Sequence, residues 1–178
     1  MEKNQKRTII SSIILIVLSV IFYRAFAPDL GDILSSLTYF ISVLAGGLTG
    51  GLAVGILSPL IAGLFDFLSP QLSEVLLYLV IGNVLLVVSF MLINQKLFNP
   101  DNLLGIIIGV FVGAVLRVIP VALAVNNMEE VTEEMRQVLG FPQFFAAFLA
   151  GLILFIGFGI LRRTGLLPDY LVTTSEEE

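Results

Sequence analysis

The chain has 178 residues, of which 57% are hydrophobic and 13% charged, and its mean hydropathy is +1.03. This composition excludes a soluble domain and predicts an all-α polytopic membrane protein, because the strands of a barrel would alternate polar and apolar residues and these apolar runs do not. The net charge of −5 comes without a basic stripe for nucleic acid, and the lack of cysteine and histidine removes thiolate chemistry and the commonest metal ligand and general base.

The first predicted span covers residues 8–26 and follows a short basic tail, residues 1–7. By the positive-inside rule this tail is cytoplasmic. No small-residue cleavage pattern follows the apolar run, so we interpret it as a retained span and not as a signal peptide. Residues 27–32 are acidic and rich in turn formers, which predicts an outer loop.

Residues 33–65 are too long for one span and short for two. The cluster LAGGLTGG, Leu44–Gly51, lies in their middle, and adjacent glycine pairs weaken a helix enough to allow a reversal. We therefore predict two short helices, roughly 33–47 and 50–65. The split gives six spans with both termini in the cytoplasm, and it keeps the basic residues after the fourth and sixth spans inside, as the positive-inside rule requires.

One arginine, Arg117, lies deep inside the fifth predicted span, 103–127. At about 1.5 Å per residue it is roughly 13 Å below the outer end, where a charge costs several kcal/mol unless it has a partner, water or a ligand. Gly105, Gly109 and Gly113 precede it at four-residue spacing, so we expect this stripe to pack on another helix and the arginine to point toward protein. Two interpretations stay open, a structurally paired or snorkelling arginine and a contact to an anionic or polar ligand.

The fourth predicted span, 74–95, contains one mid-membrane amide, Asn83. It lies about ten residues, or roughly 15 Å, below the outer end of its helix, the same level as Arg117. At one depth the two side chains can share a cavity. For Asn83 we favour an interhelical hydrogen bond, worth about 1 kcal/mol, over a contact to a ligand.

A soluble amphipathic pattern separates the last two spans, in the sequence MEEVTEEMRQVLGF. Apolar residues recur at three- and four-residue spacing and glutamates take the other face, which predicts a surface helix over 128–139 on the outer side. This helix is either packed at the interface or a movable lid. The sixth span, 143–161, closes a single six-helix domain over 8–163, followed by a cytoplasmic tail, 164–178.

The chain carries no motif that indicates catalysis. We find no metal-ligand constellation and no nucleophile beside a base, and the GGLTGG stretch lacks the lysine of a phosphate-binding loop. We therefore expect no enzyme activity, no metal and no cofactor. A membrane-embedded enzyme is the least favoured class, because no buried carboxylate pair accompanies the missing histidine and cysteine.

Three motifs and the predicted outline are shared with one family. The 178-residue chain has a glycine-rich hairpin, GGLTGGLAVGILSPL, the tripeptide Ile81-Gly82-Asn83 in the fourth span, and FPQFFAAFLAGLILF at the start of the sixth. Over residues 33–163 this pattern resembles the substrate-binding S component of an energy-coupling factor (ECF) vitamin transporter. The first span departs from the family, because the alanine small-xxx-small motif that contacts the scaffold is missing. Partial substitutes are Ser11, Ser12 and Ser19.

The resemblance implies a receptor in a prokaryotic cell membrane, surrounded by membrane lipid, that captures a vitamin-like molecule from outside. Its implied partners are a transmembrane scaffold subunit and a pair of cytoplasmic ATPases. The alternative is a non-transport scaffold or assembly protein, like the six-helix rod-shape-determining family, in which Arg117 is structural.

A substrate pocket is expected in the outer half of the membrane, where apolar walls and a few convergent polar groups would meet. The resemblance implies the same place. An arginine donates two parallel hydrogen bonds to a carboxylate, so a ligand with an anionic group is favoured over a cationic one. The predicted substrate-binding residues are Tyr78, Asn83, Arg117, Asn126, Asn127 and Gln143.

Overall fold

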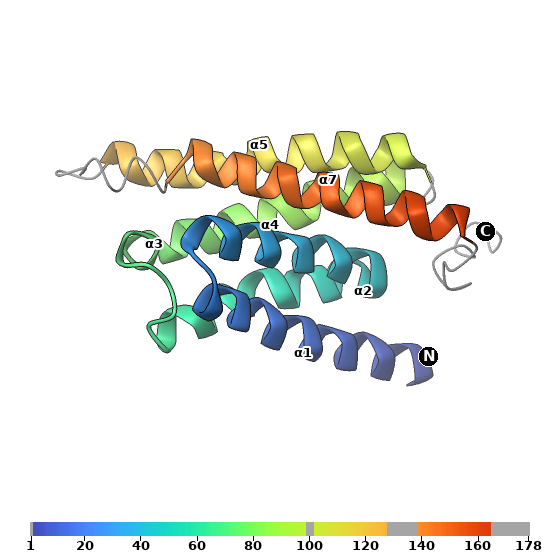
Figure 1. Ribbon diagram of the computed structural model, residues 1–178, viewed down its shortest axis with the longest axis horizontal. Helices are drawn as coiled ribbons and strands as arrows, with labels where there is room; N and C mark the ends of the chain where they lie inside the picture. Colours follow the sequence, from blue (N-terminus) through green and yellow to red (C-terminus); the bar gives the residue numbers. More distant parts are fainter. Residues whose placement is uncertain (1, 99–101, 128–138, 165–178) are drawn as a thin grey trace.

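The computed structural model describes residues 2–98, 102–127 and 139–164, and the described chain is a bundle of helices without strands (Figure 1). By length and composition, five of the helical segments can cross a membrane. The predicted surface helix 128–139 and the tail 164–178 fall almost entirely outside the described residues. The helices are α1 (Glu2–Ala25), α2 (Pro28–Leu64), the short α3 (Pro70–Glu74), α4 (Leu76–Met91) with its π-helical continuation η1 (Leu92–Leu97), α5 (Leu103–Asn127) and α7 (Phe141–Arg163).

Helix α2 is a hairpin of two helices. Gly47 has φ 61° and ψ −156°, a conformation that glycine tolerates and other residues avoid. A Cβ on Gly50 would lie 3.0 Å from the Ser42 carbonyl oxygen, whereas residues eight apart in a straight helix are separated by about 12 Å. Figure 1 shows the second half running back beside the first. The predicted reversal within 44–51 is confirmed. Because it divides α2 into two helices, the five apolar segments become six.

One predicted loop was wrong. Helix α1 begins at Glu2, so it includes the basic residues that precede the predicted span 8–26. The predicted outer loop 27–32 is instead the first turn of α2, with Pro28 at its start and Asp29 in the first turn, where proline and an acidic residue both favour a helix. The connection between α2 and α4 contains α3, whose first turn is capped by the Ser69 side chain.

The glycine stripe of α5 packs against α4 as predicted. A Cβ on Gly109 would lie 3.1 Å from the Phe90 ring, and one on Gly113 would lie 3.0 Å from the Leu86 side chain. The small residues therefore let the two helices approach closely. Arg117 follows on the same face and is fully buried.

The serines of α1 are used inside the protein. Ser12 is 7% exposed and Ser19 is fully buried. A Cβ on Gly50 would lie 3.4 Å from the Ser12 hydroxyl, and Ser35 donates a hydrogen bond to the Ser19 carbonyl over 3.3 Å. These two residues pack α1 onto α2 and are therefore not on the exposed face of α1.

The two ends of the bundle differ in charge. Figure 1 shows α1 beginning on the side where α7 ends, and this basic end carries Lys6, Arg7, Lys96 and Arg163. The opposite, acidic end carries three exposed carboxylates together with Arg24, whose guanidinium lies 5.7 Å from the centre of the Phe67 ring. The exposed acids are Asp29, Asp66 and Glu74.

Candidate functional site

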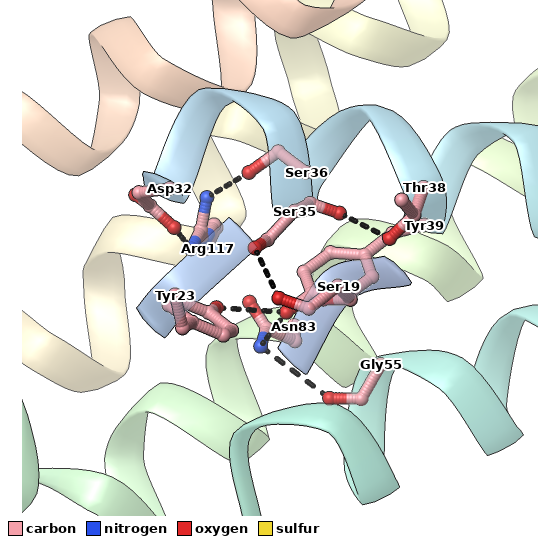
Figure 2. Close-up of polar contacts among 10 residues, drawn as sticks. All are labelled: Ser19, Tyr23, Asp32, Ser35, Ser36, Thr38, Tyr39, Gly55, Asn83 and Arg117. Carbon is pink, nitrogen blue, oxygen red and sulfur yellow. Dashed lines mark hydrogen bonds and ion pairs between the residues drawn. The ribbon is translucent and has the colours of Figure 1, made fainter. Parts of the chain in front are cut away.

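Arg117 forms an ion pair across the bundle. Its guanidinium donates to Asp32 over 2.5 Å and to the Ser36 hydroxyl over 2.7 Å, both on the first half of α2 (Figure 2). Asp32 and Ser36 are four residues apart, so a helix presents them on one face. Arg117 is fully buried and Asp32 is 6% exposed. The carboxylate therefore neutralises a cation that would otherwise cost several kcal/mol.

Asn83 joins four helical segments in a second set of contacts. Its amide nitrogen donates to the Tyr39 hydroxyl and to the Gly55 carbonyl, each over 3.4 Å. The Tyr39 hydroxyl is 2.8 Å from that of Tyr23 on α1. Figure 2 shows the group as one layer below Arg117. The interhelical hydrogen bond expected for Asn83 is thus present. The side-chain carbonyl oxygen of Asn83 is buried without a partner in the described chain.

Gly82 brings these two sets of contacts together. A Cβ at this position would lie 2.5 Å from the Arg117 carbonyl oxygen and 3.3 Å from the Arg117 Cγ. Any other residue would push α4 away from α5. Asn83 follows Gly82 in the chain, so its amide lies next to the point where α4 touches Arg117. The equal predicted depth of Asn83 and Arg117 agrees with this.

A small recess lies at the acidic end, where α2, α3 and α7 meet. Its volume is about 10 Å³, room for about one water molecule. Gln143 is the polar residue that α7 contributes, and it is 2% exposed. Neither its amide nitrogen nor its oxygen has a hydrogen-bond partner in the described chain. The recess is lined by Pro28, Asp29, Asp32, Leu72, Pro142, Gln143 and Ala146.

Three of the six predicted site residues lie elsewhere. Tyr78 is 41% exposed and lies off the buried face of α4, which carries Leu79 and Asn83. Asn126 and Asn127 are exposed at the end of α5, and the Asn127 amide donates to the Leu123 carbonyl of its own helix over 2.9 Å. The buried set is therefore Arg117, Asn83 and Gln143.

Sequence reasoning missed Asp32 and the two tyrosines. Asp32 had been assigned to a loop, although Pro28 followed by Asp29 is the usual beginning of a helix. Starting the helix there puts Asp32 one turn inside it. Its pairing also removes the main reason for expecting an anionic ligand, since Arg117 already holds a carboxylate.

A larger groove of about 490 Å³ opens at the basic end, between the start of α1 and the hairpin turn of α2. Its walls include Ile10 and Ile14, which are 58% and 54% exposed on the outside of the bundle. In a membrane such a surface faces lipid chains, so we do not assign it to a polar ligand.

The chain matches no protein-family model, no curated protein and no solved structure. Within the described residues no group of three or more carboxylates could hold a metal ion. The geometry offers a buried ion pair, the hydrogen-bonded Asn83 amide, and the buried Gln143 amide without a partner in the described chain. These groups can orient and hold a polar molecule.

Proposed function

We propose that this multi-pass protein is a substrate-binding subunit of the cell membrane of a prokaryote, which takes up a small vitamin-like molecule at its acidic end. The basic end carries Lys6, Arg7, Lys96 and Arg163, and the positive-inside rule assigns that end to the cytoplasm. The acidic end, with the recess at α2, α3 and α7, then faces outward.

The observation that supports this proposal best is Gln143. A buried amide with neither atom bonded costs a few kcal/mol, and such groups are rare in folded proteins. It lies beside Asp32, which the Arg117 pair holds in place. A ligand that supplies a donor and an acceptor would satisfy both amide atoms. The cost removed in this way would add to the affinity.

Energy for uptake would come from partners. The chain has no phosphate-binding loop with its lysine, so nucleotide hydrolysis would need separate ATPase subunits, joined through a transmembrane scaffold subunit. The resemblance to ECF S components, carried by the glycine-rich hairpin that begins within Leu44–Gly51, by Ile81-Gly82-Asn83 and by the start of α7, favours this arrangement.

The test is a thermal-shift screen of the detergent-solubilised full chain against vitamins and nucleobase derivatives. A true ligand raises stability by RT ln(1 + [L]/Kd) and therefore shows a dose response. The stabilisation should be lost in Gln143→Leu. It should persist in Asn127→Ala, a matched control that removes an exposed amide from the same end of the bundle. A screen in which no compound stabilises the protein rejects the receptor function.

A second candidate is a membrane scaffold without a ligand. The observation that favours it is that Arg117 finds two hydrogen-bond partners, Asp32 and Ser36, inside the protein, and that the recess has room for about one water molecule. On this alternative Gln143→Leu changes no binding and raises stability, because it removes an unsatisfied buried amide.

A further inference from the structure

The charged side chains that line the recess are acids. Two of its lining residues are carboxylates, Asp29 and Asp32, which lie three positions apart on one face of α2. None of the lining residues is a cation. Arg117 bonds to Asp32 but is itself fully buried, so it stands behind the carboxylate and does not reach the recess.

The helix starts and Arg117 together offset the formal charge of the two carboxylates. The recess lies at the beginning of both α2 and α7, and each helix start contributes about half a positive charge. Together they amount to about one positive charge. Arg117 adds one more behind Asp32. Because Asp29 is exposed and also lines the recess, a ligand that enters from the solvent still meets an acid first.

The wider field at this end has the same sign. Asp66 and Glu74 are exposed there. Apart from Arg117, the cation at that end among the described residues is Arg24. A surface with one dominant sign attracts ligands of the opposite charge and raises their rate of association.

Gln143 supplies the observation that points to a ligand rather than to acids alone. Its side chain is 2% exposed, lines the recess and has no partner for either amide atom within the described chain. The amide oxygen can accept from an N–H donor, and the neighbouring carboxylates accept two more. The three acceptors that line the recess suit an ammonium or amidinium group, which has several donors, while an acceptor elsewhere on the ligand would take the Gln143 N–H.

Resting on the receptor function proposed above, we propose that the substrate carries a cationic nitrogen group, which binds in the recess between Asp29, Asp32 and Gln143. This reverses the anionic preference expected from Arg117 alone. The recess has room for about one water molecule, so a larger ligand requires that α3 or the start of α7 move outward.

The test uses compounds that differ in one substituent. Pyridoxamine, pyridoxine and 4-pyridoxate share a ring and carry an amine, a hydroxyl and a carboxylate at the same position, and benzylamine, benzyl alcohol and benzoate form a second such set. Thermal shifts are measured on the full chain, on Asp29→Asn and on Gln143→Leu. Asp66→Asn is the matched control, because it removes the same charge from the same end at an exposed position outside the recess.

We expect the amine of a set to stabilise the wild type most, and each recess variant to weaken its binding by about tenfold, the effect of one hydrogen bond to a charged group. Asp66→Asn should bind as the wild type does. If the carboxylate of a set stabilises most, or the amine binds equally to Gln143→Leu, the cationic assignment is overturned while the receptor function stands. If no compound in either set or in the vitamin screen stabilises the protein, both are overturned.

Discussion

Removing the charge of Asp32 should destabilise the protein more than removing any exposed acid. Asp32→Asn keeps the size of the side chain but takes away the negative charge that lies 2.5 Å from the Arg117 guanidinium. Breaking a buried ion pair from one side typically costs about 3–5 kcal/mol, because the remaining charge stays buried without compensation. The Coulomb energy of two charges about 4 Å apart, about 4 kcal/mol at an effective dielectric constant of about 20, has the same size.

The free energy of unfolding can be measured in mixed micelles by titration with a denaturing detergent. The chain has no tryptophan, so circular dichroism of the helices is the suitable signal. Asp66→Asn is the control for an exposed carboxylate and should change stability by less than about 0.5 kcal/mol. A double variant, Asp32→Leu with Arg117→Met, should lose less than the sum of its single changes, since an apolar pair leaves no buried charge. A loss below about 1 kcal/mol for Asp32→Asn would refute the idea that the pair compensates Arg117.

Three further predictions concern topology, helix packing and a buried amide. Tags after Glu178 and in the loop 66–73 should report the cytoplasm and the exterior, and a C-terminal tag outside would contradict the six-span arrangement. Gly82→Ala should lower stability by about 1–3 kcal/mol in the same titration, because its Cβ would meet the α5 backbone. Gly157→Ala, whose Cβ meets nothing within 4 Å, should leave stability unchanged, and equal effects of the two changes would contradict the close contact. Asn94→Leu should raise stability by about 1 kcal/mol, since both of its amide atoms are buried without a partner in the described chain, and a clear loss would show that the amide is bonded.

Local patterns predicted much of the fold. The fifth span was expected over 103–127 and α5 covers the same residues, because a long apolar run flanked by Asn-Pro-Asp and Asn-Asn has unambiguous ends. The hairpin turn followed from the chemistry of glycine at 44–51. The stripe of small residues in α5 predicted a close helix contact, because four-residue spacing fixes the face on which they lie.

Partners and faces were harder to predict. Arg117 and Asp32 are 85 residues apart in the sequence, so nothing local connects them. Tyr78 was expected in the site from its depth alone, but depth does not give the rotation of a helix, and its side chain faces outward next to the buried Leu79. Gln143 was identified from its place at the outer start of the last span, and it is buried beside the recess.

Native mass spectrometry of the full chain tests most directly whether the acidic end is a receptor site. The protein, released from detergent after incubation with a small-molecule extract of rich bacterial medium, should retain one bound compound that is neither lipid nor detergent. Asp66→Asn should retain the same mass, and Gln143→Leu should lose it. A wild-type spectrum that shows lipid and detergent alone, or a bound compound that Gln143→Leu keeps at equal occupancy, would contradict a substrate-binding role for this recess.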